Sequence, residues 1–270
     1  MGVDLLILGG SGLLGTALCE AASSAGLRWA ATHLTTERSG EEWHLADLSG
    51  REATFELLNR FAPEAVINAA YVQRGSHLDA LTADLPGWVA ERTATRARLV
   101  QLSSDVVFDG ELGRPYREGD DPSPVNEYGA AKVRAERAVA ANDPHAVIVR
   151  TSLLWGGSGD GGSHMALVQK PGVRFFTDEY RNPINVDSLA AACLELVDRP
   201  EISGLLHIAG PDRVDRLTFA RALAPLVGVD PHSLQGGSGA EQPGRPADVS
   251  LDSSLAESLL STELQGLPGH

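Results

Sequence analysis

The chain has 270 residues, of which 43% are hydrophobic, and this is enough for one large α/β domain or for a nucleotide-binding domain with a small appendage. The formal net charge of −14 argues against nucleic acid or an anionic membrane as the main partner, because phosphate groups need a basic surface. Cys19 and Cys193, the two cysteines, lie in apolar helical patterns. We therefore expect core thiols in a reducing cytoplasm, and neither a disulfide nor a metal site.

The first predicted element is a buried parallel strand over Val3–Leu8, followed by a turn and a helix that begins at Leu13. This apolar start is too short to span a bilayer and lacks the basic flank of a signal peptide. Gly9, Gly12 and Gly15 follow it in the spacing G-x-x-G-x-x-G. Such glycines allow a tight turn, close approach to a pyrophosphate and close helix–strand packing, with the positive end of the helix dipole facing the phosphates. The spacing predicts a dinucleotide site, the alternative being a simple tight strand–helix turn.

Short apolar runs alternate with helical patterns through the first 150 residues. The further strands that we predict are Leu27–Thr32, a short segment closed by Asp47 and Leu48, Ala65–Asn68, Leu99–Leu102 and Val147–Val149. Three helices are predicted between these strands. The first begins with a capping box of Ser49 and Glu52 and ends before Pro63. The second covers residues 81–95, with a start disturbed by Pro86, and the third covers Tyr128–Ala141. This alternation predicts an α/β fold with a Rossmann-type, doubly wound parallel sheet. Its ligand is expected at the carboxyl ends of the strands, where Gly9, Asn68 and Ser104 fall.

After Arg150 the alternation becomes looser. The predicted elements are a glycine-rich loop over residues 156–162, helices over 185–197 and 217–227 with a strand over 205–208 between them, a loose loop over 236–247, a short helix over 253–260 and a frayed Gly-Pro tail. We interpret residues 1–155 as an NAD(P)-binding domain. Residues 156–270 are interpreted as a small C-terminal substrate-binding lobe built on the same sheet.

Tyr128 and Lys132 form the sharpest chemical pattern in the sequence. They lie four residues apart and so share one face of a helix. A nearby ammonium is expected to lower the pKa of the phenol, which can then give or take a proton near neutral pH. Ser104, at a predicted strand end, can hydrogen-bond a substrate carbonyl, while Ser103 points into the sheet. The alternative is an incidental pair on a solvated helix, but lysine is rare here: Lys132 and Lys170 are the only lysines among 22 basic residues.

Three segments with these residues resemble a known family. They are LVQLSSDVVFDG (99–110), NEYGAAKVRAE (126–136) and VIVRTSLLWG (147–156). With the glycine motif, they are similar to the extended short-chain dehydrogenases/reductases, and within these to the dTDP-4-dehydrorhamnose reductase branch, which includes the regulatory β subunit of methionine adenosyltransferase. The resemblance covers about residues 1–220. It implies a Rossmann fold and NAD(P)H-dependent hydride transfer to the 4-keto group of a nucleotide-linked deoxysugar.

The resemblance also implies roles for individual residues. Tyr128 is the expected general acid, Lys132 holds the nicotinamide ribose, and Ser104 orients the carbonyl. The residues expected at the cofactor are Gly9, Ser11, Gly12, Leu13, Gly15, His33, Arg38, Asp47, Leu48, Ala69, Ala70, Tyr71, Ser103, Tyr128, Lys132 and Thr151. The residues expected at the substrate are Ser104, Asp105, Val106, Trp155 and Arg181.

The end of the second strand favours NADP(H) over NAD(H). An acidic residue about 20 positions after the glycines usually binds the ribose 2′-hydroxyl, but here none occurs before Glu37. Thr35, Thr36 and Arg38 can instead hold a 2′-phosphate. The alternative for Arg38 is a solvated loop residue, in which case NAD(H) is the cofactor.

Several departures from the family pattern leave the substrate open. Val106 stands where relatives often have a tyrosine, Trp155 replaces another tyrosine, and the final lobe is short. The alternatives are a reductase of a non-sugar ketone from secondary metabolism and a non-catalytic, NADP-binding regulatory subunit. Arg181 is expected either to clamp a nucleotide diphosphate or to form a surface ion pair with Asp178 or Glu179.

We expect a small-molecule ketone as partner, no nucleic acid, no membrane and no metal, and the sequence allows a homodimer. His44 and Asp47 are too sparse for a metal site. The sequence also contains neither a G-x-S-x-G nucleophile elbow nor a P-loop lysine motif.

Overall fold

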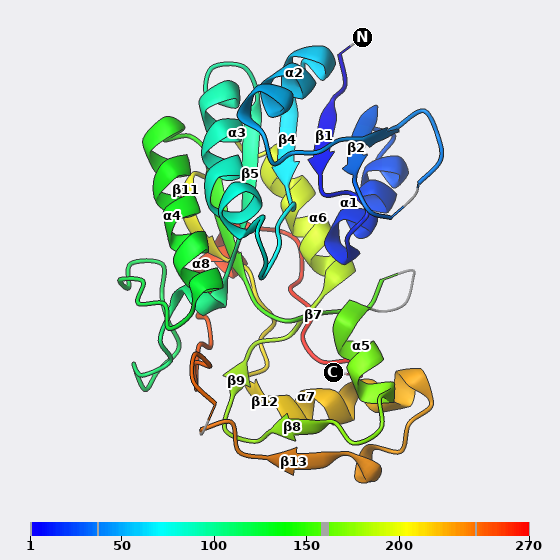
Figure 1. Ribbon diagram of the computed structural model, residues 1–270, viewed down its shortest axis with the longest axis vertical. Helices are drawn as coiled ribbons and strands as arrows, with labels where there is room; N and C mark the ends of the chain where they lie inside the picture. Colours follow the sequence, from blue (N-terminus) through cyan, green and yellow to red (C-terminus); the bar gives the residue numbers. More distant parts are fainter. Residues whose placement is uncertain (1, 37, 158–161, 241, 270) are drawn as a thin grey trace.

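A seven-stranded parallel sheet forms the centre of the computed structural model, which describes residues 2–36, 38–157, 162–240 and 242–269 (Figure 1). The strand order is β11-β6-β5-β4-β1-β2-β3. The strands are β1 (Leu5–Leu8), β2 (Trp29–His33), β3 (Trp43–Leu45), β4 (Ala65–Asn68), β5 (Arg98–Ser104), β6 (Val147–Thr151) and β11 (Gly204–His207). Because every neighbouring pair in this sheet is parallel, the predicted doubly wound Rossmann-type fold is confirmed.

Helices cover both faces of the sheet. One face carries α1 (Leu13–Ser24), α6 (Val186–Val197) and α8 (Ser254–Leu259), and the other carries α2 (Arg51–Phe61), α3 (Leu85–Thr93) and α4 (Glu127–Asn142). Successive residues of β1 belong alternately to the two core clusters, as the period of a strand requires. Cys19 and Cys193 are free thiols in the first cluster, which confirms them as core residues.

Two helix starts differ from the prediction. The capping box of Ser49 and Glu52 is wrong: Gly50 is the N-cap of α2 and makes no side-chain cap, and the Ser49 N–H donates to the Asp47 carboxylate (2.9 Å). The predicted helix over residues 81–95 begins earlier, with a π-helical segment, η1 (Asp79–Asp84), and continues as α3. Pro86 is tolerated there because the first turn of a helix needs no N–H donor.

The lobe lies beyond the carboxyl ends of the strands, at the bottom of Figure 1. It contains β7 (Leu154–Trp155), α5 (Gly162–Gln169), β8 (Arg174–Phe176), β9 (Tyr180–Arg181), β10 (Ile184–Asn185), β12 (Val214–Asp215), α7 (Arg216–Leu223), η3 (Ala224–Val227) and β13 (Gln235–Gly237). The pairs are β7 with β10, β8 with β13 and β9 with β12. The chain returns from the lobe to the sheet in α6, β11 and α8.

The lobe is more regular than predicted. Most of the predicted glycine loop, residues 158–161, lies outside the described residues, but α5 begins at Gly162. The predicted loose loop over 236–247 is wrong at its start, because β13 pairs with β8 there. The predicted helix over 217–227 is divided into α7 and η3.

The predicted frayed tail is also wrong. Leu264 and Leu267 are only 6% and 7% exposed, and they pack in the sheet core and the lobe core respectively. The Gly266 carbonyl accepts a hydrogen bond from Trp155 Nε1 (2.8 Å). Burial of these leucines favours an ordered tail that connects the lobe to the sheet.

No helix in the ranges given above is long and apolar enough to cross a membrane.

Candidate active site

The glycine loop after β1 has the geometry that the sequence predicted. Gly9 has φ +80°, and a Cβ there would lie 2.7 Å from the Ala70 Cα. A Cβ on Gly15 would lie 2.2 Å from the Gly9 carbonyl oxygen, so glycine is needed for α1 to pack against the loop. A Cβ on Gly12 would meet its nearest protein atom at an ordinary 3.5 Å. No protein atom excludes a side chain at Gly12. A glycine there is instead explained by a ligand that approaches the backbone closely.

The amino end of α1 is free to receive an anion. Gly12 is its N-cap and makes no side-chain hydrogen bond, and the first turn contains no acidic residue. The first N–H groups of the helix therefore lack a side-chain acceptor, and the helix dipole adds positive potential there. These features fit the pyrophosphate of a dinucleotide.

The end of β2 fits the ribose phosphate of NADP. Arg38 is not simply solvated: its Nη2 lies 3.4 Å from the Ser11 carbonyl and 3.1 Å from Thr16 Oγ1, and its guanidinium lies 5.2 Å from the Trp43 ring centroid. His33 Nδ1 is buried and has no hydrogen-bond partner among the described residues. The Arg38 guanidinium, which lies across the glycine loop, and the unpaired ring nitrogen of His33 can both hydrogen-bond a phosphate group. Glu37, the first acidic residue after β2, lies outside the described residues.

The ends of two further strands carry other residues expected at the cofactor. Ala70 lies against Gly9, and its N–H donates to the side chain of buried Asn68 (3.2 Å). Tyr71 follows and is 49% exposed. After β3, Asp47 is exposed, whereas Leu48 is buried in the sheet core.

The predicted catalytic residues come together near Tyr71. Ser104 ends β5, and Tyr128 and Lys132 lie one turn apart on α4. The Ser104 hydroxyl is close enough to act on the pKa of Tyr128, and the rings of Tyr71 and Tyr128 lie 5.9 Å apart. A Cβ on Gly129 would lie 2.2 Å from the Val106 carbonyl oxygen, so glycine lets α4 begin directly against the segment after Ser104. Tyr71 thus lies between the residues expected at the cofactor and the predicted catalytic residues.

The electrostatics of the tyrosine differ from the prediction. Burial raises the pKa of Tyr128 well above its ordinary value, the neighbouring Tyr71 and Asp105 raise it further, and the Ser104 hydroxyl opposes them. The expected net lowering of this pKa is therefore wrong, because burial outweighs any effect of the Lys132 ammonium. Lys132 Nζ donates to the Leu102 carbonyl (3.0 Å) and lies 5.9 Å from the Tyr128 ring centroid. A phenol with a raised pKa stays protonated at neutral pH, which suits a proton donor.

Lys132 is a buried charge. It is 3% exposed, and burial lowers its pKa from 10.5 to about 8, although Glu136 opposes this shift. The surface-lysine alternative is excluded by this burial. A site that holds an ammonium despite this cost is consistent with function.

Ser103 is not placed for a side-chain contact with the cofactor. Its hydroxyl donates to Glu136 Oε1 (2.5 Å), and Glu136 forms a buried ion pair with Arg150 (2.7 Å). The expectation for the Ser103 side chain is therefore corrected: the alternation of the strand turns it toward the underside of α4. Sequence reasoning missed Glu136 and Arg150, although a glutamate one turn after Lys132 in an alanine-rich helix was a usable signal. Thr151, at the end of β6, carries a buried hydroxyl without a partner in the described ranges.

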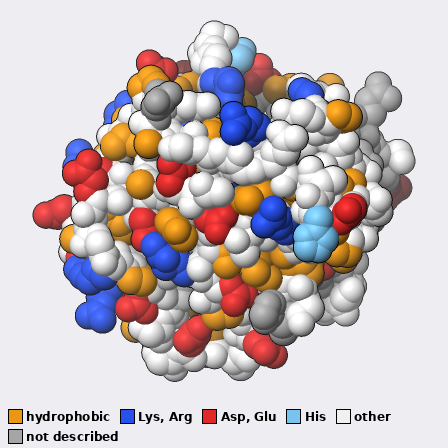
Figure 2. Space-filling view, turned by 90° about the horizontal axis from the view of Figure 1, so that it is seen from below, with side chains coloured by type: hydrophobic (Ala, Val, Ile, Leu, Met, Phe, Trp, Pro, Cys, Tyr) orange, Lys and Arg blue, Asp and Glu red, His pale blue; other side chains and the backbone are white. Residues whose placement is uncertain are grey.

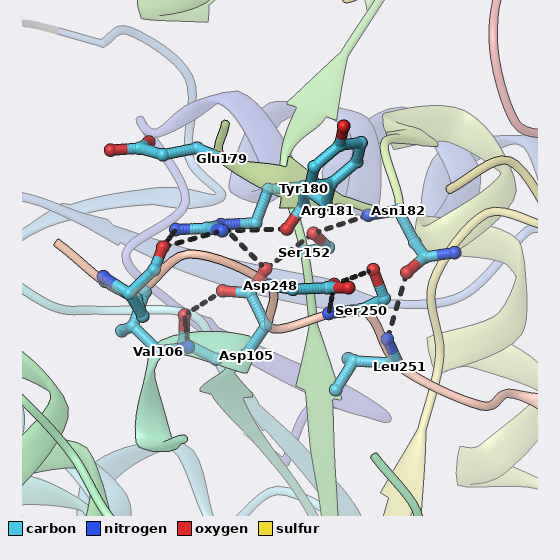
Figure 3. Close-up of polar contacts among 12 residues, drawn as sticks. Asp105, Val106, Ser152, Glu179, Tyr180, Arg181, Asn182, Asp248, Ser250 and Leu251 are labelled. Carbon is cyan, nitrogen blue, oxygen red and sulfur yellow. Dashed lines mark hydrogen bonds and ion pairs between the residues drawn. The ribbon is translucent and has the colours of Figure 1, made fainter. Parts of the chain in front are cut away.

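Arg181 is also placed differently from the prediction. It is 4% exposed, and its Nε lies 3.6 Å from Asp105 Oδ2 (Figure 3). It is therefore neither a free clamp nor a surface partner of Asp178 or Glu179; Glu179 instead pairs with Arg245. Separation in sequence prevented this prediction, because Asp105 and Arg181 meet only when the lobe packs on the sheet.

Two other residues expected at the substrate are partly buried. Val106 follows Ser104 in η2 (Asp105–Val107). Trp155 packs against the lobe core, and its indole nitrogen is used by the tail. Both side chains lie near the junction of sheet and lobe.

Arg216, at the start of α7, was missed in the sequence. The face seen in Figure 2 carries basic and acidic side chains side by side without a continuous basic area. Arg216 has no carboxylate within 4 Å in the described part of the chain, and His164 Nδ1 lies 3.4 Å from its Nη2. Burial lowers its pKa to about 10, and Asp105 and Arg181 are among the charges that act on it. An arginine of this kind suits an anionic ligand.

Within the described ranges, no group of three or more His, Cys, Asp or Glu residues is arranged to hold a metal ion.

Comparisons with known proteins place this geometry in context. The RmlD substrate binding domain family matches residues 3–268. The dTDP-4-dehydrorhamnose reductase of Mycobacterium tuberculosis is 31% identical over 268 residues, 93% of this chain and 84% of the relative. Methionine adenosyltransferase 2 subunit beta of Bos taurus is 29% identical over 276 residues, 94% of this chain and 82% of the relative.

Solved structures agree with the fold. A hypothetical dTDP-4-dehydrorhamnose reductase from Sulfolobus tokodaii superposes with a TM-score of 0.82 at 28% identity, covering 98% of this chain and 97% of that one. The dTDP-4-dehydrorhamnose reductase of Bacillus anthracis in complex with NADP has a TM-score of 0.79 at 21% identity, with 98% and 96% covered.

Proposed function

The chain belongs to the RmlD substrate binding domain family, and from this we propose that it is an NADPH-dependent reductase of the 4-keto group of a nucleotide-linked deoxysugar. The observation that carries the proposal is the meeting of Ser104, Tyr128 and Lys132 near Tyr71. A curated relative at 31% identity is a reductase of this kind. A chain that only regulates another enzyme does not need Ser104, Tyr128 and Lys132 together, because it transfers no proton.

The residues expected at the cofactor fit a nicotinamide dinucleotide, which supplies the hydride when bound. Gly9, Gly12 and Gly15 accommodate the pyrophosphate, and Arg38 with His33 favours the 2′-phosphate of NADP(H) over NAD(H). The further residues proposed at the cofactor are Ser11, Leu13, Asp47, Leu48, Ala69, Ala70, Tyr71, Lys132 and Thr151. The unpaired Thr151 hydroxyl is a ready donor or acceptor for the ligand.

The chemistry of the residues follows from their charge states. Tyr128, held neutral by burial, donates its proton to the carbonyl oxygen as the carbonyl carbon becomes tetrahedral, and the product is an alcohol. Ser104, whose hydroxyl donates to Asp105 Oδ1 in this structure, turns its proton to the same carbonyl oxygen when the substrate is bound and so holds that oxygen in place. Lys132, with a pKa of about 8, is mostly cationic at pH 7 and stabilises the phenolate that Tyr128 leaves behind. Solvent then returns the proton to Tyr128.

We propose residues 156–270 as the substrate-binding part of the chain, although within this range β11 lies in the sheet and α6 and α8 pack on it. The lobe beyond the sheet is proposed to bind the nucleotide part of the substrate. Arg216 replaces Arg181 as the residue that binds the diphosphate, since Arg181 is engaged with Asp105. Val106 and Trp155 are proposed at the sugar. Two buried free thiols suit a reducing compartment, so we place the protein in the cytoplasm, and we propose a homodimer as its assembly.

Two alternatives have an observation behind them. A non-sugar ketone as substrate is favoured by Val106, because a tyrosine hydroxyl is absent there. A regulatory subunit is favoured by the 29% identity to methionine adenosyltransferase 2 subunit beta.

Turnover measurements decide among these functions. Purified protein is supplied with NADPH and, in parallel, with nucleotide-linked 4-keto sugars and with aromatic or polyketide ketones, and NADPH oxidation is followed. Tyr128→Phe is expected to remove most activity while leaving the Kd for NADPH nearly unchanged, because the phenol acts mainly in proton transfer. Tyr180→Phe, which removes a hydroxyl elsewhere in the lobe, serves as the control. Full turnover in Tyr128→Phe contradicts the mechanism, and a stoichiometric enzyme partner with no ketone reduced favours the regulatory alternative.

A further inference from the structure

A buried carboxylate links the catalytic serine to the lobe. Asp105 is 3% exposed, and its Oδ1 accepts a hydrogen bond from the Ser104 hydroxyl (3.2 Å). Its Oδ2 accepts a hydrogen bond from the Ser152 hydroxyl (2.6 Å) and faces Arg181 Nε at 3.6 Å (Figure 3). The Ser104 oxygen also accepts a weak hydrogen bond from the Val106 N–H (3.4 Å). The hydroxyl of Ser104 is therefore held from two sides.

The position of Arg181 is set by the lobe. Arg181 lies in β9, which pairs with β12, and its Nη1 donates to the Tyr180 carbonyl (2.8 Å). Both Nη atoms lie 3.3 Å from the Pro246 carbonyl. Asn182, directly after β9, donates its N–H to the Ser152 hydroxyl (3.3 Å), so the same segment of the lobe also holds the second partner of Asp105.

Stability alone is a weak reason for this buried pair. Taking two charges out of water costs free energy that their attraction only partly returns, and replacing such pairs by apolar residues is often neutral or stabilising. The pair nevertheless lies next to Ser104, and it joins Asp105, at the end of β5, to Arg181 in the lobe. This placement points to a role in arranging the site.

We propose that Asp105 is a positioning residue for the Ser104 hydroxyl and that Arg181 holds Asp105 in place, so that the serine is correctly set only when the lobe is packed on the sheet. The proposal rests on the proposed ketone reduction. It extends that function, because the lobe would then not only bind substrate but also be needed to place the Ser104 hydroxyl.

The charges around Asp105 determine how this arrangement responds to pH. Arg181 faces it from β9, Arg216 acts on it from α7, and its own charge raises the pKa of Tyr128 on α4. Glu179 and Arg245 act on Arg216 in turn. Burial raises the pKa of Asp105, and Arg181 is the largest influence that lowers it. Removing the guanidinium therefore raises the pKa of Asp105, and the carboxylate becomes protonated at a higher pH as the solution is acidified.

The experiment compares Asp105→Asn, Arg181→Gln and the double variant with wild type. Asp105→Asn is expected to lower kcat by about tenfold or more, because small misplacements of catalytic groups have large effects, with the Kd for NADPH unchanged. Arg181→Gln is expected to move the acid limb of the kcat–pH profile to higher pH. In the double variant this limb is expected to be absent. Arg213→Gln, which removes an arginine from the exposed Arg213–Asp248 pair of the same lobe, is expected to behave like wild type.

The outcomes separate the two proposals. Wild type that reduces no ketone contradicts the proposed function, whereas active wild type with unchanged kcat and pH profile in Asp105→Asn and Arg181→Gln overturns the positioning role. If a single variant fails to fold because it leaves one buried charge unpaired, the double variant, which has neither charge, supplies the kinetic comparison. A double-mutant cycle of Ser104→Ala and Asp105→Asn on the free energy of unfolding needs no substrate. A measurable coupling supports the hydrogen bond between them, and zero coupling overturns the proposal.

Discussion

Replacing Lys132 by methionine is expected to make the protein more stable and less active. Lys132 is 3% exposed, and burial lowers its pKa from 10.5 to about 8. At 1.36 kcal/mol for each pKa unit, this difference means that the charged lysine lowers the free energy of unfolding at neutral pH by about 3 kcal/mol. Methionine has a similar length and no charge, so it removes this cost.

Little opposes the gain in stability. The mutation removes one hydrogen bond from the ammonium to the Leu102 carbonyl, worth about 1.5 kcal/mol net because its donor is charged. That carbonyl keeps a second donor, Gln101 Nε2, at 2.9 Å, and is not left unsatisfied. Lys132→Met is therefore expected to raise the free energy of unfolding at pH 7 by about 1.5 kcal/mol. Its kcat/KM is expected to fall at least about tenfold, because a cation beside Tyr128 is lost.

The sign of the pH dependence follows from the folded pKa lying below the unfolded pKa. Below pH 8 the lysine is charged in both states and the full cost is present. As the pH rises from 8 to 10.5, the unfolded state binds more protons, so wild type gains stability; about 1.3 kcal/mol of this gain falls between pH 7 and pH 9. Lys132→Met lacks this gain, so the stability difference between the two proteins shrinks as the pH rises.

Urea unfolding at pH 7 and pH 9, together with steady-state kinetics, measures these effects. Lys170→Met is the matched control, since Lys170 is the only other lysine and is exposed. It is expected to change neither the pH dependence nor the activity. Lys132→Arg retains the charge in a bulkier, forked group and is also expected to lower kcat/KM by about tenfold or more. A Lys132→Met protein less stable than wild type at pH 7, or a difference that does not change with pH, refutes the reasoning.

Three further predictions concern the cofactor loop and the lobe. Gly15→Ala would place a Cβ 2.2 Å from the Gly9 carbonyl oxygen and is expected to lower the free energy of unfolding by about 1–3 kcal/mol. Gly12→Ala, whose Cβ would lie 3.5 Å from the nearest protein atom, is expected to leave urea unfolding nearly unchanged but to weaken NADPH binding. The reverse pattern of the two variants would contradict the assigned roles. Arg38→Ala is expected to weaken NADPH binding about tenfold or more and NADH binding little, by fluorescence titration, and equal losses for both cofactors would exclude a 2′-phosphate contact. Arg216→Gln is expected to raise the Kd for a nucleoside diphosphate about tenfold by calorimetry with NADPH binding unchanged, and an unchanged Kd would remove Arg216 from the substrate site.

Local patterns in the sequence were sufficient to predict the sheet and to single out Ser104, Tyr128 and Lys132 as candidates. Short continuous apolar runs and helical apolar patterns predicted the alternation of strands and helices, because the strands of a parallel sheet are buried on both faces and its helices on one. The spacing of Gly9, Gly12 and Gly15 predicted a loop whose geometry depends on residues close in the chain. Tyr128 and Lys132 were found together because four residues make one helical turn.

Only the tertiary structure determined which side chains pair with one another and which of them are protonated. Arg181 meets Asp105 because the lobe packs on the end of β5, and no local pattern connects residues so far apart. The tail is ordered because Leu264 and Leu267 find apolar surfaces on distant elements. The pKa of Tyr128 is raised because burial outweighs any influence of the neighbouring lysine, whose ammonium is held by a backbone carbonyl. Burial depends on which surfaces of the whole chain come together, and this is why spacing alone predicted which residues form the site but not their protonation.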